Sequence, residues 1–175
     1  GLILDEGIAL NIAFTAMQIH ELFLKRILGG LVKWRDDQAI QQAAREYIKM
    51  LAIKCVHENQ KVRELSGGNQ QKICLARAFA LDPKLLFVSE PTRGIDIGAK
   101  KLVLDMIYKR NREFGTTIVM TSSELEEMRS ICDRIAIVHE GKIAGILPAS
   151  CDSSEFGLLL MGAKSSSEEG VVSVG

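Results

Sequence analysis

Residues 65–72 read Leu-Ser-Gly-Gly-Asn-Gln-Gln-Lys, and residues 85–92 read Leu-Leu-Phe-Val-Ser-Glu-Pro-Thr. The first stretch opens a run whose apolar residues recur at the helical period, which predicts a helix over 66–81. The second is a short continuous apolar run that ends in an acid, Glu90. Such a run is typical of a strand that is buried on both faces. A helix followed by a buried strand predicts an α/β fold.

The alternation of helix and strand continues beyond residue 92. We expect a helix over 98–112 that ends at Gly115, and a β-branched strand over 116–121. The spacing Ser123-x-x-Glu126 predicts a capping box that opens another helix. The segments 134–138 and 142–147 then predict a hairpin. Strands and helices in this order imply a parallel sheet that helices cover.

The ends of the chain differ from its middle. Residues 1–64 are expected to form a helical subdomain, in which Asp36 and Asp37 cap a helix and the single tryptophan, Trp34, packs in the core. Residues 65–147 are expected to form the α/β core. Residues 148–175 form a tail in which order fades, with a polar stretch at 165–170.

Composition narrows the class of protein. The 175 residues are 47% apolar and carry 22 basic and 22 acidic side chains. Zero net charge argues against bulk attraction to nucleic acid or to anionic lipid. No apolar run reaches the roughly 18 residues of a membrane span. The chain opens on Gly1 and not on Met, so we expect it to be part of a longer protein.

The four cysteines have no paired spacing, which favours a reducing compartment and argues against a metal site. Cys74 and Cys132 lie in apolar helical patterns and are expected to be buried thiols. The three histidines are isolated in sequence, and none is expected to bind a metal.

Ser66 and the two glycines after it stand at a predicted helix start. The first N–H groups of a helix have no partner inside it, and the helix dipole adds a partial positive charge there. Glycines let an anion approach the backbone, and the Ser66 hydroxyl adds a donor, so this start suits a phosphate group. The alternative is that Ser66 is only an N-cap and the glycines only form a turn.

The two stretches, in this order with Leu75-Ala76-Arg77-Ala78 between them, resemble the ATP-binding-cassette (ABC) ATPases. Residues 68–72 together with 91–100 are similar to the second cassette of the duplicated ATPases that drive bacterial ribose and galactose importers. The resemblance extends from residue 1 to about 147. It implies a partial P-loop NTPase core with a mainly parallel sheet, an N-terminal helical subdomain and no phosphate-loop strand.

The resemblance also implies roles for single residues. Ser66, Gly67 and Gly68 would contact the γ-phosphate of ATP bound to the opposite cassette. The other residues implied to lie at this nucleotide site are Leu65, Asn69 and Gln70. Glu90 would be the catalytic carboxylate, for which the alternative role is capping the turn that follows.

Three further positions follow from the resemblance. Asp96 would lie in the loop that crosses to the partner cassette. Ser89 stands where the family usually has the Asp that supports Mg²⁺ through water, and Ser123 stands where most members have a histidine. Ser89 is therefore either the mark of a naturally weak site or a variant position. Ser123 is expected to cap its helix and not to reach the nucleotide.

The implied protein is an ATPase subunit that uses ATP and Mg²⁺, lies peripherally on the cytoplasmic face of the cell membrane and energises sugar import. Its implied partners are the other cassette, the permease and, indirectly, a sugar-binding protein, with no nucleic acid. The alternatives are a non-catalytic regulatory cassette and a soluble ABC ATPase that acts on nucleic acid or ribosomes. No Gly-x-x-x-x-Gly-Lys-Ser/Thr phosphate loop occurs in the 175 residues, so this chain by itself is expected to be inactive.

Overall fold

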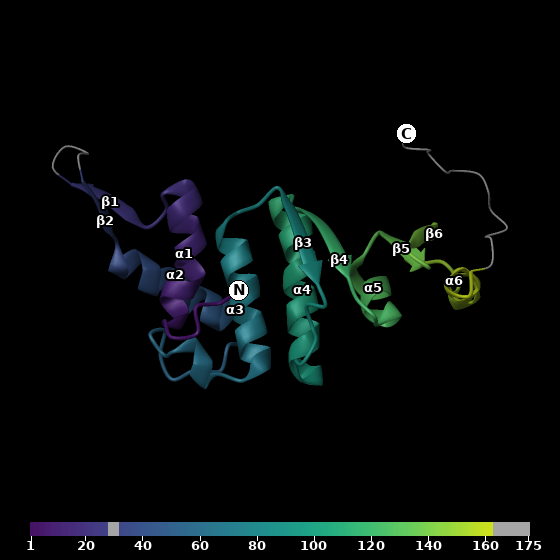
Figure 1. Ribbon diagram of the computed structural model, residues 1–175, viewed down its shortest axis with the longest axis horizontal. Helices are drawn as coiled ribbons and strands as arrows, with labels where there is room; N and C mark the ends of the chain where they lie inside the picture. The colour runs from purple at the N-terminus through teal and green to yellow at the C-terminus, as the bar shows by residue number, and fades with distance from the viewer. Residues whose placement is uncertain (28–31, 163–175) are drawn as a thin grey trace. The chain divides into compact units, whose positions relative to one another are not determined.

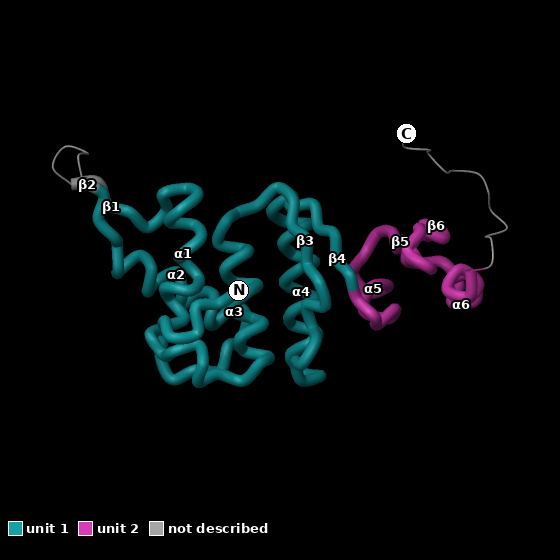
Figure 2. The backbone as a smooth tube through the Cα atoms, in the orientation of Figure 1, with its two compact units in different colours: residues 1–121 teal, residues 122–175 magenta. Residues whose placement is uncertain are grey.

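The computed structural model describes residues 1–27 and 32–162, which fall into two compact units divided after Thr121 (Figure 2). The boundaries predicted from the sequence motifs lie elsewhere, after residues 64 and 147, and they stay a prediction. Figure 1 labels the elements of the first unit as α1 (Ile8–His20), β1 (Leu24–Ile27), β2 (Val32–Arg35), α2 (Asp37–Met50), α3 (Gly67–Ala80), β3 (Leu85–Ser89), α4 (Ile97–Phe114) and β4 (Thr117–Thr121). The 3₁₀ helix η2 (Val62–Glu64) precedes α3.

Three helices build the N-terminal part of this unit. α1 packs against α2 and α3, and it buries one apolar face that includes Ile8, Ile12 and Ala16. α2 begins where predicted, because the Asp36 carboxylate accepts a hydrogen bond from the Ala39 N–H at 3.2 Å. Removing such a cap commonly costs about 1 kcal/mol of stability. The predicted helix over 66–81 is confirmed as α3.

Residues 1–64, predicted to form a helical subdomain, also contain two strands in the segment between α1 and α2. There β1 and β2 form an antiparallel hairpin with Leu24 opposite Arg35. Trp34 lies on β2 with 64% of its surface exposed, so its predicted place in the core is wrong. The two strands pair with each other, and among the described residues no further strand joins them. The hairpin therefore leaves this indole uncovered.

β3 and β4 form a parallel pair, with Leu85 opposite Thr117 and Ser89 opposite Thr121. The predicted strand over 85–89 is confirmed, but its predicted burial on both faces is wrong. Val88 is 8% exposed while its neighbour Phe87 is 72% exposed, because successive side chains of a strand point to opposite faces and only one face is covered here. Among the strands that the structure describes, the expectation of a mainly parallel sheet holds for this pair alone.

α4 connects β3 to β4, as the sequence predicts. Val103 and Ile107 are its buried residues, and Gly115 ends it in the left-handed conformation, with φ of 69°. Glycine adopts this conformation without the steric cost that a Cβ brings.

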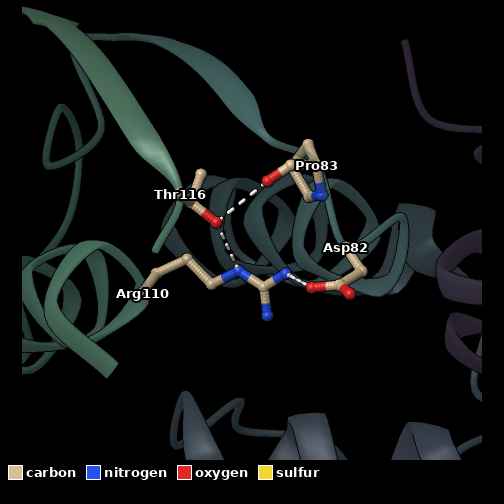
Figure 3. Close-up of polar contacts among 4 residues, drawn as sticks. All are labelled: Asp82, Pro83, Arg110 and Thr116. Atoms are coloured by element: carbon tan, nitrogen blue, oxygen red, sulfur yellow. Dashed lines mark hydrogen bonds and ion pairs between the residues drawn. The ribbon is translucent and has the colours of Figure 1, made fainter. Parts of the chain in front are cut away.

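A polar cluster joins the ends of α3 and α4 to the start of β4 (Figure 3). The hydroxyl of Thr116, which is fully buried, donates to the Pro83 carbonyl at 2.9 Å and accepts from Arg110 Nε at 3.2 Å. Arg110 also forms an ion pair with Asp82, and its guanidinium lies 4.9 Å from the centre of the Phe114 ring. One buried hydroxyl thus bonds both to the loop that precedes β3 and to α4.

Thr116→Val keeps the shape of this side chain but leaves the Pro83 carbonyl and Arg110 Nε without it. We expect the free energy of unfolding to fall by about 1–3 kcal/mol, the usual cost of a buried polar group that loses its partner. Urea unfolding followed by circular dichroism measures the change. Thr117→Val, at the next residue, which is exposed and begins β4, is the control and should change stability by less than about 0.5 kcal/mol. Equal effects of the two substitutions would contradict this account.

The second unit contains α5 (Leu125–Ile131), β5 (Arg134–His139), β6 (Lys142–Pro148) and α6 (Ser153–Leu160). The predicted hairpin is confirmed: β5 and β6 are antiparallel, and Glu140 and Gly141 at the turn both have positive φ. This pair forms a sheet of its own, and no ladder joins β4 to β5 in the described parts of the chain.

The expectation that order fades beyond Pro148 is wrong as far as residue 160. α6 places Phe156 and Leu159, both fully buried, against Ile135, Ile137 and Leu147 of the hairpin. An antiparallel pair needs such a covering element, because two strands alone are marginally stable in water. The polar stretch at 165–170 lies outside the described residues.

The thiols of Cys74 and Cys132 are half-buried and not fully buried as predicted. Burial still raises the pKa of the Cys132 thiol, with a smaller contribution from nearby Asp133.

Within residues 1–27 and 32–162, none of the helices has the length and apolarity that a membrane crossing requires.

Candidate functional site

The start of α3 presents the predicted phosphate-binding residues, and we call residues 66–68 the signature turn. Ser66 is the residue at the N-cap position, and it is exposed together with Gly67, whereas Gly68 is half-buried. The first helical bond runs from the Gln70 N–H to the Ser66 carbonyl at 3.0 Å. The N–H groups before Gln70 have no acceptor within the helix and are available to an anion.

Asn69 orients the Ser66 hydroxyl. Its Nδ2 donates to Ser66 Oγ at 3.0 Å, while its Oδ1 accepts from the Lys54 N–H at 3.0 Å. The Ser66 side chain makes no capping hydrogen bond to its own helix, so this hydroxyl does not act as a simple N-cap. A hydroxyl that accepts from Asn69 can still donate its own proton outward. The motif placed Asn69 at the site, but its link to Lys54 has no signal in the sequence.

Gln70 and Leu65 support the turn from behind. Gln70 Nε2 donates to the carbonyls of Val62 at 3.2 Å and Leu65 at 3.0 Å, which ties η2 to the first turn of α3. Leu65 is buried. Both residues were predicted to lie at the nucleotide, and the structure gives each of them a contact that holds the backbone of the turn.

The lysine that closes the 65–72 stretch points inward. Lys72 is buried, and its amine donates to the Ala52 carbonyl at 3.0 Å. Burial lowers the pKa of this amine, and the charge of Asp96 acts in the opposite direction. Lys72 therefore fixes the loop after α2 and does not add to the exposed surface of the signature turn.

The two glycines of the signature turn meet different surroundings. A Cβ on Gly68 would lie 2.9 Å from the main-chain oxygen of Gly94, a distance that Cβ atoms in proteins do not adopt, whereas a Cβ on Gly67 would meet nothing within 4 Å. The close approach of two backbones thus requires a glycine at position 68, whereas Gly67 leaves open space in front of the helix.

We expect Gly68→Ala to lower the free energy of unfolding by about 1–3 kcal/mol, as overpacking against backbone does. Gly67→Ala is the matched control, and it should change stability by less than about 1 kcal/mol, the range of the propensity difference between the two residues. Urea unfolding of both variants measures the difference. Equal stabilities would show that the backbone at Gly94 moves freely, and would contradict the predicted clash.

Glu90 follows directly on β3, where a parallel strand delivers its last side chains to the edge of the sheet. Its backbone is left-handed, with φ of 46°, and its N–H donates to the Thr121 carbonyl at 2.8 Å. Beside it, Ser89 Oγ accepts from Thr121 Oγ1 at 3.0 Å. Ser89 is thus held by the neighbouring strand and offers no charge to a cation.

Asp96 caps α4, since its carboxylate accepts from the Ala99 N–H at 3.0 Å. We call residues 90–96 the Glu90 loop. It brings Glu90, at the end of β3, and Asp96, at the start of α4, onto one short connection beside the signature turn. The role of Asp96 at an interface stays a prediction.

The predicted capping box at Ser123 is wrong. α5 begins later, with Glu124 at the N-cap position and no capping bond from its side chain. Ser122 is the residue that ties this helix start, because its Oγ accepts from the Glu124 N–H at 3.0 Å and donates to Glu127 at 3.3 Å. The bonded residues, Ser122 and Glu127, lie one position before and one position after the predicted pair, Ser123 and Glu126.

The chemistry of the described residues fits a phosphate group better than a divalent cation. The exposed start of α3 supplies N–H donors and an oriented hydroxyl. Mg²⁺ prefers carboxylate oxygens and water in octahedral geometry, and near Glu90 the adjacent donor is the Ser89 hydroxyl, which already accepts from Thr121. Across the parts of the chain that the structure describes, no group of three His, Cys, Asp or Glu side chains is arranged to hold a metal.

Comparison with known proteins places this geometry in context. The family model described as "ABC transporter" matches residues 5–93. The chain is 38% identical, over 155 residues, to a ribose import ATP-binding protein RbsA of Bacillus cereus, covering 89% of this chain and 29% of that protein. It is 46% identical, over 121 residues, to the arabinose import ATP-binding protein AraG of Ralstonia nicotianae, covering 69% and 24%. The chain thus spans less than a third of the length of these relatives.

Among solved structures, the fold matches the dimeric ATP-binding cassette MJ0796 bound to ADP and Pi, with a TM-score of 0.71 and 22% identity over 87% of this chain and 60% of that one. At this identity the likeness shows the fold. The mixed α/β architecture of the present chain is therefore that of part of an ATP-binding cassette.

Proposed function

The chain belongs to the ABC transporter family, and from that premise we propose that it is part of the second cassette of a sugar-importer ATPase. In this proposal Ser66, Gly67 and Gly68 bind the γ-phosphate of an ATP molecule held by the opposite cassette. The carrying observation is the exposed signature turn, whose hydroxyl is oriented by Asn69 at 3.0 Å. A site that two bodies share forms only when they close, so nucleotide would hold the clamp shut.

Glu90 is proposed as the carboxylate that polarises the attacking water at the cassette's own site. Phosphoryl transfer needs such a positioned group together with cationic stabilisation of the phosphate. Mg²⁺, when bound, supplies part of that positive charge. Ser89 holds a hard cation weakly, and Ser123 supplies neither the charge nor the reach of an imidazole. We therefore assign this cassette a weak site of its own and a complete contribution to the site of its partner.

The proposed protein is peripheral, on the cytoplasmic face of the cell membrane. Its proposed partners are the other cassette and the permease, with a sugar-binding protein acting through the permease. The relatives named for ribose import and arabinose import support a sugar as the solute. The phosphate-loop strand of the sheet is proposed to lie outside these 175 residues, in accord with β4 and β5 belonging to separate sheets here.

The ATPase rate of the intact protein tests the proposal, measured with and without its permease in lipid vesicles. An importer ATPase should hydrolyse ATP faster when the sugar-loaded binding protein engages the permease. A regulatory cassette is the second candidate, favoured by Ser89. For that candidate, the intact protein would bind ATP but show no turnover that depends on the permease. Turnover that depends instead on RNA or DNA would favour the soluble alternative.

A further inference from the structure

Gln71 connects the signature turn to the Glu90 loop. It lies one residue beyond Gln70 on α3, and its Nε2 donates to the main-chain oxygen of Glu90 at 3.3 Å. The two glutamines thus contact different parts of the chain, since Gln71 bonds to Glu90 whereas Gln70 bonds to carbonyls that precede the helix. The motif assigns no role to Gln71.

A second contact lies on the same face of α3. Gly68 and Gln71 are three residues apart, and residues at this spacing are neighbours on a helix surface. A Cβ on Gly68 would lie 2.9 Å from Gly94 O and 3.5 Å from the Ile95 Cα, so the helix backbone rests directly on the Glu90 loop. The first turn of α3 is therefore fixed to this loop at two points, while Ser66 and Gly67 remain exposed.

The backbone of Glu90 needs such support. A non-glycine residue in the left-handed conformation costs about 1–3 kcal/mol and persists where its surroundings hold it. The bonds that hold the peptide groups at Glu90 include those from its N–H to Thr121 O at 2.8 Å, from the Arg93 N–H to its carbonyl at 3.2 Å, and from Gln71 to the same carbonyl at 3.3 Å. Of these bonds, the one from Gln71 is made by the side chain of a residue on another element, α3.

We propose that Gln71 is a positioning residue that joins the signature turn to the Glu90 loop, so that the two move together. This inference rests on the proposed function, in which Ser66 serves the partner's ATP and Glu90 serves the cassette's own ATP. Gln71 then transmits the position of one nucleotide site to the other within a single cassette. A displacement of the Glu90 loop shifts α3, and with it the hydroxyl and N–H groups offered to the partner's phosphate.

The test uses the full-length ATPase with its permease. Gln71→Leu keeps the size of the side chain and removes the donor, and Gln71→Glu keeps its shape but cannot donate when ionised. Both are expected to lower kcat about tenfold while the KM for ATP stays within about twofold, because positioning is lost and binding is not. Gln38→Leu, at an exposed position on α2, is the control and should retain the parent kcat. Thermal unfolding of each variant confirms that it is folded.

Double-mutant cycles separate positioning from a structural role. Combined with Ser66→Ala, and separately with Glu90→Gln, Gln71→Leu should lower kcat by no more than about threefold further, since its effect passes through those groups. A full tenfold loss in both backgrounds, or parent kcat in both Gln71 variants, would overturn the role of Gln71. A Ser66→Ala variant with parent activity would instead overturn the proposed function, so the two failures are distinguishable.

Discussion

Ser66→Arg in the full-length ATPase is expected to abolish transport-coupled ATP hydrolysis, whereas Glu90→Gln is expected to have a smaller effect. Ser66 is exposed at the start of α3, and its hydroxyl accepts from Asn69, so its own proton can be donated to a ligand. An arginine there removes the hydroxyl, and its long side chain covers the N–H groups of the signature turn. Losing preorganised donors of this kind commonly costs about 10²–10³-fold in rate.

The smaller effect at Glu90 follows from its neighbour. In the proposed function Ser89 stands in the place of the family's Mg²⁺-supporting carboxylate, and its hydroxyl accepts from Thr121 at 3.0 Å. A site already weakened in this way has less rate to lose when Glu90 becomes neutral. The measurement is the ATPase rate of each variant assembled with the permease, and Gln38→Arg, which places the same charge on an exposed part of α2, is the control. The reverse order of effects would rule out the assignment of the main role to the signature turn.

The 175-residue chain studied alone is expected to show no ATP hydrolysis and to bind ATP with a Kd above about 1 mM, a binding free energy weaker than about −4 kcal/mol. The residues that it contains include no phosphate loop, whose lysine and backbone cradle form the main grip on ATP phosphates in this class of protein. A signature turn reaches only the end of the triphosphate, and in the proposal it does so from the opposite body. One helix start contributes modestly to the binding of an anion in water.

Isothermal titration with ATP and Mg²⁺ measures this affinity, and the intact protein serves as the positive control. The intact protein should bind ATP far more tightly under the same conditions. A micromolar Kd for the 175-residue chain would contradict the account, because it would require an ATP site built entirely from these residues.

The helices and strands that were predicted correctly are those with a strong apolar periodicity and clear ends. α3 and α4 each carry an apolar stripe, and Asp82-Pro83 and Gly115 mark where they stop. The second hairpin was readable because Glu140-Gly141 separates two apolar runs. Where local pattern and tertiary packing agree, the pattern is sufficient.

The predictions that the structure contradicts failed for different physical reasons. The strands of the first hairpin are four residues each, too short for a period to stand out, so Trp34 was placed in a core that does not cover it. α6 carries two buried residues in eight, Phe156 and Leu159, a signal that becomes visible only once the hairpin that they cover is known. Phe87 is exposed because its face of the sheet is not covered, and the sequence of the strand does not reveal which faces are covered.

At the candidate site, motif and resemblance supplied the exposed groups but not their supports. Ser66 and Gly67 stand where predicted, at an open helix start. The bonds from Asn69 to Lys54 and from Gln71 to Glu90 join residues that are 15 and 19 positions apart, and nothing in local spacing encodes them. Such contacts arise from how α3 packs, which the sequence alone does not display.

The most direct measurement is a structure of the intact ATPase closed on a non-hydrolysable ATP analogue. We predict that Ser66 Oγ and the N–H groups at the start of α3 lie about 3 Å from the γ-phosphate of the analogue bound to the other cassette, the distance of a hydrogen bond. A closed state in which these groups face bulk solvent, with no nucleotide near them, would contradict the account.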